Sequence, residues 1–330
     1  MILINNKNIH DPTINLALEE YCVRNFDVEK ENYILFYINE PSIIIGKHQC
    51  TLEEINYEYV KKHNIYVVRR ISGGGAVYHD KGNLNFSFIT KHSENSIHNF
   101  EKFTKPIRDS LTNLCIDAEL TGRNDIVVEG RKISGNAQFT NLKAMFSHGT
   151  LLFDSHLEDV VRALNVKSDK IESKGIKSIR SRVANITEFL KKEITIEEFR
   201  KIIIDSIFSE YKTVPIYELT ENEWKEVMKL SNEKYRNWDW NFGRSPEFNI
   251  QKVKRFDVGQ IDARIFVKNG VIKNIKIYGD FLCVTDSEDV EILLKGIKYN
   301  EKNILNSISS LDLRKYFGDL SAKEFAGFLV

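Results

Sequence analysis

The stretch RRISGGGAVYHDKGNLNFSF, residues 69–88, places three consecutive glycines between two predicted strands. The first strand is predicted over IYVVRRI (65–71), which is rich in β-branched residues. The second is predicted over NLNFSF (83–88), where polar and apolar residues alternate strictly. The alternation puts Leu84, Phe86 and Phe88 on one face, and the opposite face can line a polar pocket. The pattern therefore predicts a strand that ends in a glycine loop.

Glycine contributes no side chain to packing and loses much conformational freedom on folding, so Gly73, Gly74 and Gly75 are not explained by regular structure. They permit either a close backbone approach to a ligand or an unusual turn. Arg69 and Arg70 precede them, and the polar residues His79, Asn83 and Asn85 follow, which favours an anion-binding arrangement. The loop lacks the GK[ST] of a Walker motif and the GxGxxG of a dinucleotide fingerprint. A phosphate would therefore be held by a different fold.

A second motif, GRNDIVVEGRKISGNA (122–137), is predicted to form a hairpin that turns at Glu129-Gly130. The hairpin brings a carboxylate, an amide and a lysine together across two strands. Asp125 could hold Mg²⁺, and Lys132 could stabilise charge on a reacting carboxyl or phosphate group. On these residues alone, a turn-capping aspartate and a solvated lysine explain the motif equally well.

Two further segments carry polar groups. His148-Gly149-Thr150 begins a strand predicted over HGTLLF (148–153) and offers hydrogen-bond donors beside a glycine, although a single histidine is more often structural. The stretch KGIKSIRSR (174–182) is rich in cations. It is either a solvated surface loop or a mobile lid over a nucleotide phosphate.

The remaining pattern is mixed. Asp11 and Pro12 predict the capped start of an amphipathic helix that runs to about residue 25, and strands joined by a turn are predicted at 33–38 and 42–46. A capping box at Thr51–Glu54 predicts a helix to about residue 63, and another helix is predicted over 100–116. Residues 157–237 are mostly helical in pattern, with capping boxes that begin at Thr195 and Thr220. Alternation returns after residue 248 with a turn at Asn269-Gly270, so a small antiparallel sheet is predicted beyond a domain boundary near 246.

Composition narrows the function classes. The 330 residues are 42% hydrophobic and 28% charged, which suits two globular domains. Lysine plus arginine and aspartate plus glutamate both number 47, so no overall field attracts nucleic acid or an anionic membrane. No signal-peptide stretch and no run of roughly 18 to 20 apolar residues is present, which predicts a cytoplasmic protein. The four scattered cysteines lack CxxC spacing, which argues against a zinc site or a disulfide framework.

Taken together, the motifs at 69–88, 122–137, SHGTLLF (147–153), KGIKSIRSRVANITE (174–188) and WDWNFGRSPEF (238–248) resemble the bacterial lipoate–protein ligases. The motifs occur in order and span nearly the whole chain. The resemblance implies an α/β (α+β) fold, in which a mixed-sheet catalytic domain of the biotin and lipoate ligase type occupies residues 1–246. A smaller α/β accessory domain, residues 247–330, is implied to move relative to it during the reaction.

The same resemblance implies roles for individual residues. Arg70 and the 72–77 loop cradle the lipoyl adenylate, with His79 and Asn83 behind them, and Lys132 contacts the acyl carbonyl and phosphate as the catalytic residue. Asp125 lies near the adenylate and Mg²⁺, and 171–183 forms an adenylate-binding loop. The complete set of implied site residues is Arg70, Ser72, Gly73, Gly74, Gly75, Ala76, Val77, Tyr78, His79, Asn83, Asn124, Asp125, Lys132, Ser134, Gly135, His148, Gly149, Thr150, Lys174 and Arg182.

The activity implied by the resemblance is ATP-dependent lipoate salvage. Lipoate is activated to lipoyl-AMP with Mg²⁺ and release of pyrophosphate, and the lipoyl group then passes to a lysine of a lipoyl-domain protein. The implied acceptors are the acyltransferase subunits of 2-oxoacid dehydrogenases and the glycine cleavage H protein. The expected partners are these acceptors, ATP and lipoate, with no nucleic acid or membrane, and the expected state is a monomer.

The chain departs from some relatives at Gln138-Phe139-Thr140, where they carry an arginine that touches lipoate. Three alternatives to a ligase each make a demand on the sequence. An acyltransferase of the same fold would need a cysteine thioester, but none of the four cysteines lies in the 122–153 motifs or just after them. A non-catalytic binding module would be expected to lose the set Arg70, Asp125 and Lys132, and a nucleic-acid-binding protein would need an added domain.

Overall fold

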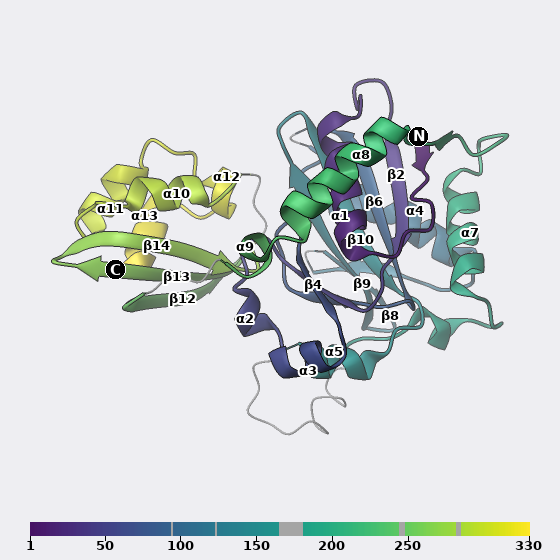
Figure 1. Cartoon of the computed structure of the whole chain (residues 1–330), viewed down its shortest axis with the longest axis horizontal. Coiled ribbons are helices and arrows are strands. Elements are labelled where there is room, and N and C mark those ends of the chain that lie inside the picture. Colours follow the sequence, from purple (N-terminus) through teal and green to yellow (C-terminus); the bar gives the residue numbers. More distant parts are fainter. Residues whose placement is uncertain (94, 123, 165–180, 244–247, 282–284) are drawn as a thin grey trace.

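The computed structural model describes residues 1–93, 95–122, 124–164, 181–243, 248–281 and 285–330. Figure 1 shows a larger part, coloured purple to green, and a smaller part, green to yellow, beside it. The N-terminus lies in the larger part and the C-terminus in the smaller one. The mixed α/β fold expected from the sequence is confirmed.

An eight-stranded mixed sheet forms the frame of the larger part, in the order β11-β1-β2-β6-β10-β9-β8-β7. Strand β1 pairs in parallel with β2 and β11, and the pairs from β2 to β7 are antiparallel. The strands are β1 (Ile2–Ile4), β2 (Tyr33–Ile38), β6 (Asn83–Lys91), β7 (Glu119–Thr121), β8 (Asp125–Val128), β9 (Arg131–Thr140), β10 (Ala144–Leu152) and β11 (Ile216–Tyr217).

Helices cover both faces of this sheet. On one face, Leu84, Phe86 and Phe88 of β6 form a core with α4 and α7, as the alternation predicted. On the other face, α1 packs against the sheet and α8 packs against α1. The helices of the larger part are α1 (Pro12–Asn25), α2 (Thr51–Glu54), α3 (Tyr57–Lys62), α4 (Phe100–Thr112), α5 (Leu157–Ala163), η1 (Ile186–Phe189), α7 (Ile196–Ile207), α8 (Glu221–Leu230), η2 (Ser231–Tyr235) and α9 (Trp238–Asn241).

A second, three-stranded sheet in the larger part carries the glycine loop. Its strands are β3 (Ser42–Ile45), β4 (Tyr66–Arg69) and β5 (Val77–His79), in the order β4-β3-β5. The strands predicted at 33–38 and 42–46 are both present, but they belong to different sheets. The chain therefore crosses from the large sheet to the small sheet between β2 and β3.

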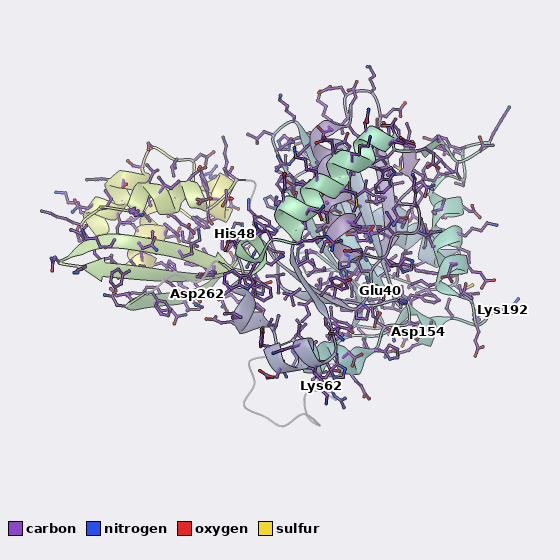
Figure 2. All side chains as sticks on the ribbon, viewed as in Figure 1. Glu40, His48, Lys62, Asp154, Lys192 and Asp262 are labelled. Carbon is purple, nitrogen blue, oxygen red and sulfur yellow. The ribbon has the colours of Figure 1, made fainter. Side chains whose placement is uncertain are left out.

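The smaller part has its own hydrophobic core. An antiparallel sheet of β12 (Ile250–Phe256), β13 (Gly259–Lys268) and β14 (Val271–Gly279) packs against α10 (Glu288–Leu294), α11 (Glu301–Ile308), α12 (Arg314–Phe317) and α13 (Ala322–Leu329). Asn269 and Gly270 both have positive φ at the predicted turn. His48 and Asp262 mark the region where the two parts meet (Figure 2). The boundary near 246 lies among residues 244–247, outside the described ones, and stays a prediction.

Two local predictions were wrong. Thr51 does not open a capping box, because Cys50 is the N-cap of α2 and the chain leaves the helix at Ile55. The Thr51 hydroxyl instead donates to the carbonyl of Asn241 and accepts from Arg69, so tertiary contacts take the groups that a cap would use. Helix α1 begins at Pro12 with Asp11 as its cap, as predicted, but it is buried on most sides rather than amphipathic.

Within the described residues, no helix combines the length and the apolar character required to cross a membrane.

Candidate functional site

Arg70 braces the glycine loop from inside. The residue is 5% exposed, and its guanidinium donates to the carbonyls of Ile44 (3.0 Å), Gly73 (2.7 Å) and Gly75 (2.8 Å). Burial lowers the pKa of Arg70 to about 10, while the nearby Glu19 carboxylate opposes that shift, so the side chain stays charged at neutral pH. The charged guanidinium thus contacts backbone carbonyl groups, and these hydrogen bonds hold the loop in its conformation.

The loop packs against the segment after β3 with no room for a side chain. A Cβ atom on Gly46 would lie 1.8 Å from the carbonyl oxygen of Gly74, and Gly74 itself has φ +93°. The amide of Lys47 donates to the Ser72 carbonyl at 2.9 Å. Glycine is required at 46 for close approach and at 74 for backbone conformation.

A buried polar chain joins the loop to helix α1. The Ser72 hydroxyl lies 2.8 Å from Nε2 of His148, and Nδ1 of His148 lies 3.0 Å from both carboxylate oxygens of Glu19. Glu19 is 1% exposed and His148 is 8% exposed. This arrangement orients the imidazole and holds Ser72, so His148 acts on the loop from the large sheet.

These elements enclose a cavity of about 150 Å³ between the large and the small sheet. Twelve residues of the predicted set line it: Arg70, Gly74, Gly75, Ala76, Val77, His79, Asn124, Lys132, Gly135, His148, Gly149 and Thr150. Apolar side chains of Leu16, Ile44 and Ala137 complete the wall together with Tyr37. The cavity therefore combines an apolar wall with a few polar groups, which is the usual composition of a small-molecule site.

His79 presents an unused hydrogen-bond donor at this cavity. The Asn39 amide oxygen accepts from Asn15 (2.9 Å), so its nitrogen faces Nδ1 of His79 at 3.0 Å. Nδ1 must then accept, which leaves the proton on Nε2, and Nε2 is buried without a partner among the described residues. Burial, with the charge of Arg70 adding to it, lowers the pKa of His79 to about 3. His79 is therefore a neutral donor at physiological pH.

The depressed pKa of His79 predicts acid sensitivity of the fold. The unfolded chain, with an ordinary histidine pKa near 6.5, binds more protons than the folded chain below that pH, so stability is full above pH 6.5 and falls as the pH drops toward 3. At pH 5 the loss from this one group is about 2 kcal/mol of unfolding free energy. Urea unfolding at pH 7.5 and pH 5 should show a smaller pH-dependent loss in His79→Gln than in wild type. Equal losses would contradict the assignment of a neutral buried imidazole.

Lys132 and Asp125 form an ion pair at the solvent side of the cavity. Their side chains are 38% and 37% exposed, with Nζ 2.7 Å from Oδ1. The pair is possible because Glu129 and Gly130 form the predicted turn with positive φ at both residues, which aligns β8 with β9. A Cβ atom on Gly135 would lie 3.0 Å from Nζ of Lys132, so glycine at 135 leaves space for the lysine side chain.

Backbone contacts place the end of the basic segment beside Lys132. The Lys132 amide donates to the Arg182 carbonyl at 2.7 Å, and Ala184 returns a bond to the Lys132 carbonyl at 3.0 Å. Most of the predicted adenylate-binding loop, including Lys174, lies outside the described residues. The described end of that segment is therefore anchored next to the lysine.

The other predicted residues lie around the cavity without lining it. Ser72 and Gly73 contact Arg70 behind the loop, and the hydroxyl of Ser134 accepts from Asn136. Asn83 donates to Asn85, whose side chain does line the cavity. Tyr78 belongs to the core beneath the small sheet.

Sequence reasoning missed several lining or supporting residues. Glu19 carries the least local signal, because its partner His148 lies 129 positions away in the chain. Asn136 lines the cavity, and its buried Oδ1 has no partner among the described residues. Gln138, where an arginine was noted as missing, accepts from the amide of His98 at 2.7 Å and donates to Ser147. The sequence offered a clue for Asn136, which lies within the GRKISGNA motif, and none for Glu19.

Residues 11–208 match the family described as the lipoyl protein ligase A/B catalytic domain, and residues 245–329 match the bacterial lipoate protein ligase C-terminus. One relative is the lipoate-protein ligase LplJ of Bacillus subtilis. It is 56% identical over 327 residues, which cover 98% of each chain.

Solved structures with the same fold include Plasmodium falciparum LipL1 in complex with lipoate. It has a TM-score of 0.80 at 27% identity, covering 94% of each chain. A lipoate-protein ligase A bound with ATP matches with a TM-score of 0.62 at 31% identity, covering 74% of this chain and 97% of that one.

Proposed function

The chain belongs to the bacterial lipoate–protein ligase family, and from this membership we propose that it activates lipoate with ATP and transfers the lipoyl group to a lysine of an acceptor protein. The solved structures with bound lipoate and bound ATP support both substrates for this chain. The reaction passes through lipoyl-AMP, and pyrophosphate is released.

One observation carries the proposal: a partly apolar cavity opens beside Lys132 on the β8–β9 hairpin. The wall of Leu16, Ile44 and Ala137 suits an aliphatic acyl chain, and the glycine loop lets a ligand approach the backbone closely. Lys132 lines the same cavity from its solvent side. A carboxylic acid that enters tail first would therefore leave its carboxylate near a cation.

The first step brings two anions together, because a carboxylate oxygen must attack the α-phosphorus of ATP as the bond to pyrophosphate breaks. Lys132 offsets this repulsion and stabilises the negative charge that develops on the phosphoryl oxygens. Asp125 keeps the ammonium group in place between turnovers. The proposed substrate-binding set is Arg70, Ser72, Gly73, Gly74, Gly75, Ala76, Val77, Tyr78, His79, Asn83, Asn124, Asp125, Lys132, Ser134, Gly135, His148, Gly149, Thr150, Lys174 and Arg182.

A divalent cation fits this site only in combination with the nucleotide. No cluster of three or more His, Cys, Asp or Glu side chains among the described residues could hold a metal ion alone. Mg²⁺ is usually held by one or two carboxylates together with substrate phosphates, and Asp125 could supply one carboxylate. Bound there, the ion would neutralise phosphate charge.

The second step needs no protein nucleophile. The amine nitrogen of the acceptor lysine attacks the acyl carbon, AMP leaves with the bonding electrons, and the amine loses a proton. The proposed acceptors are lipoyl-domain proteins. We further propose that residues 1–246 hold the active site, that residues 247–330 are accessory, and that the enzyme is a monomer.

Pyrophosphate exchange into ATP tests the proposal directly. Purified protein with MgATP and labelled pyrophosphate should support exchange when lipoate is added, with octanoate and biotin as the comparison acids. Exchange that depends on lipoate confirms activation through an adenylate. Exchange with biotin alone, or with none of the acids while the protein is folded, would overturn the proposal.

The cysteines distinguish this route from a thioester transferase. Cys22 and Cys50 are buried and Cys115 is exposed. Burial, with the Glu19 carboxylate adding to it, raises the pKa of the Cys22 thiol well above its usual value, which disfavours the nucleophilic thiolate. We expect Cys22→Ala, Cys50→Ser, Cys115→Ser and Cys283→Ser to change lipoylation less than about twofold, since an amine attacks an adenylate without a thiol. A hydroxylamine-labile acyl group on any cysteine would instead establish the transferase.

A further inference from the structure

A second cavity, of about 490 Å³, lies between the loop before α1 and one side of α7. Two neighbouring residues of β2 show that it is separate from the main cavity, the one that Lys132 lines. Tyr37 lines the main cavity, and Ile38 lines the second one. Successive side chains of a strand point to opposite faces of a sheet. The two cavities therefore lie on opposite faces of the large sheet, and none of the described residues lines both.

Arg200 of α7 brings a positive charge to the second cavity. Its side chain is partly buried, and Nη1 donates to the neutral Oδ1 of Asn8 at 3.2 Å. No carboxylate among the described residues forms an ion pair with it. Burial lowers the pKa of Arg200, while the charge of Glu197, one helical turn before it, opposes this shift. The edge of the guanidinium formed by Nε and Nη2 thus has no acceptor within the part of the chain that the structure describes.

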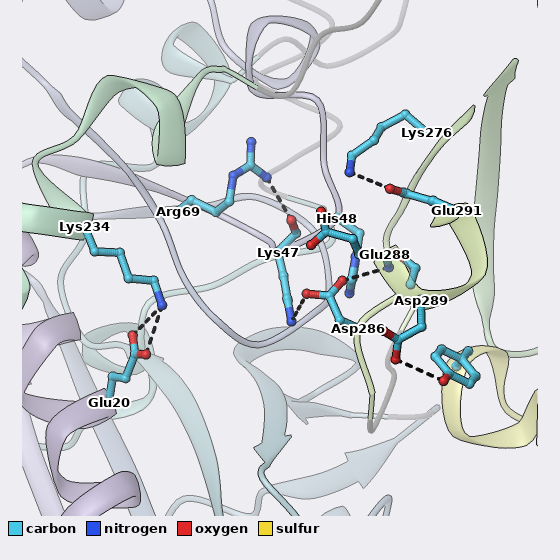
Figure 3. A network of polar contacts seen from close by, with 12 residues as sticks. Glu20, Lys47, His48, Arg69, Lys234, Lys276, Asp286, Glu288, Asp289 and Glu291 are labelled. Carbon is cyan, nitrogen blue, oxygen red and sulfur yellow. Dashed lines mark hydrogen bonds and ion pairs between the residues drawn. The ribbon is translucent and has the colours of Figure 1, made fainter. Parts of the chain in front are cut away.

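Two other partly buried cations of the chain are paired with carboxylates. Nζ of Lys47 lies 2.8 Å from Asp286, and Nζ of Lys234 lies 2.7 Å from Glu20, as the dashed lines in Figure 3 show. A charge that leaves water loses hydration, and an opposite charge normally compensates for this loss. Arg200 lacks such a partner, which indicates a place for an anion from outside the chain.

The loop before α1 holds Asn8 opposite Arg200. Lys7 and Asn8 have φ of 54° and 52°, and the Ile9 amide donates to the Asn6 carbonyl at 3.1 Å, which defines a tight turn. The buried Asn6 side chain accepts from the Asn8 amide at 3.2 Å and donates to the Ile9 carbonyl at 3.1 Å. The acceptor of Arg200 therefore belongs to an anchored turn, so the guanidinium is oriented before a ligand arrives.

The rest of the lining provides a second cation and an apolar floor. The exposed Lys201 forms no ion pair with any described residue, and the His10 ring adds a further polar group. Apolar side chains come from the three isoleucines at positions 9, 38 and 204. Glu197 is the single carboxylate in the described lining. Its charge disfavours a polyphosphate, so an anion with one charged head group fits best.

We propose that the second cavity binds a small organic oxyanion, a carboxylate or a phosphate monoester, whose head group contacts Arg200 and Lys201 and whose carbon body lies on the three isoleucines. The free edge of the guanidinium offers two parallel N–H donors, which match either head group. A cavity of about 490 Å³ is of the size usual for small-molecule sites and is larger than an inorganic phosphate fills. The site goes beyond the proposed ligase activity and uses none of its residues.

Calorimetric titration of the full-length protein tests the site, with lipoate present to occupy the main cavity. The probes are phenyl phosphate and benzoate, which carry the two head groups on the same ring. At least one of them should bind, and roughly tenfold more tightly than inorganic phosphate, because the ring buries apolar surface. Benzyl alcohol, which has the ring without the charge, should not bind. Failure of both aromatic anions to bind would overturn the proposal, as would equally tight binding of inorganic phosphate.

A pair of double variants locates the binding. Arg200→Gln with Lys201→Gln should weaken it by more than about tenfold, since charge-assisted hydrogen bonds are lost. The matched control is Lys105→Gln with Arg108→Gln, which removes one lysine and one arginine from the neighbouring helix α4, outside the cavity. The control should leave binding unchanged. Equal binding by wild type and the first variant, or an equal loss in the control, would refute the site.

Hydrogen exchange on the wild-type protein gives a readout that does not depend on how the variants fold. The anion that binds should slow exchange in peptides covering 5–10 and 196–207 and leave 100–112 unchanged. Protection confined to 69–79 and 124–150 would place the anion in the main cavity and contradict the proposal. A folded protein that binds no lipoate would refute the proposed function, while these titrations and exchange rates would still decide the second site.

Discussion

Lys132→Ala is expected to lower the rate of lipoate-dependent pyrophosphate exchange by ~10² to 10³, because removal of one well-placed electrostatic contact to a developing anion typically costs that much. The fold should be unaffected. Lys132 is 38% exposed and its pair with Asp125 faces solvent, so the pair contributes little to stability. Exchange kinetics and urea unfolding on the same preparation measure the two effects separately.

Lys91→Ala provides the matched control for Lys132→Ala. Lys91 ends strand β6 of the large sheet, as Lys132 lies at the start of β9, and it also forms an ion pair, with Glu29 at 2.6 Å, but it lies outside the cavity lining. Its removal should leave exchange unchanged. Lys132→Arg retains a charge with a different shape and should recover only part of the rate. Turnover within threefold of wild type in folded Lys132→Ala would rule out the assigned role.

Arg70→Met is expected to destabilise the protein by about 3 kcal/mol and to abolish most activity, because two buried carbonyls and one partly buried carbonyl lose their donor. The methionine fills similar space, so the loss reports the hydrogen bonds rather than a cavity. The carbonyls of Ile44 and Gly73 are buried and that of Gly75 is partly buried, so the loop should lose its shape without the guanidinium. Urea unfolding gives the stability, and calorimetry gives the affinity for lipoate.

Arg70→Lys is the informative comparison for Arg70→Met. A lysine keeps the charge but cannot donate in the fork that reaches Gly73 and Gly75 together. If the arginine acts by bracing the loop, lysine should rescue little of the lost stability. Full rescue by lysine would show instead that charge alone matters, and that Arg70 acts as a general cation for the substrate.

The sequence predicted the elements that are determined by residues close together in the chain. The hairpin of β8 and β9 was expected because Glu129-Gly130 suits a turn with two positive φ values, and the structure has φ 50° and 72° there. The glycine loop was expected from its three consecutive glycines. The polar face of β6 was expected because spacing along a strand determines the face on which a residue lies. Most of the predicted cavity residues come from these segments.

Contacts between distant segments could not be predicted in this way. Arg69 forms hydrogen bonds with Trp240 and Asn241, about 170 positions away in the chain, and no local sequence pattern predicts these bonds. The direction of a long side chain is equally hidden, so the spacing of Arg70 did not reveal that it faces carbonyls. Thr51 shows tertiary contacts overriding a local signal, because its hydroxyl serves Arg69 instead of a helix cap.

Four of the cavity-lining positions are glycines, at 74, 75, 135 and 149, so much of the wall is main chain. The main chain has the same chemistry whichever residue stands at these positions. A Cβ atom on Gly149 would lie 2.6 Å from the Phe86 ring, so a side chain does not fit there. Divergence in acyl-chain preference among descendants of this sequence is thereby confined to the few lining positions that carry replaceable side chains, such as Leu16, Tyr37 and Ala137. Only a few positions are therefore available, to natural selection or to a protein engineer, for changing the acyl-chain preference of this enzyme.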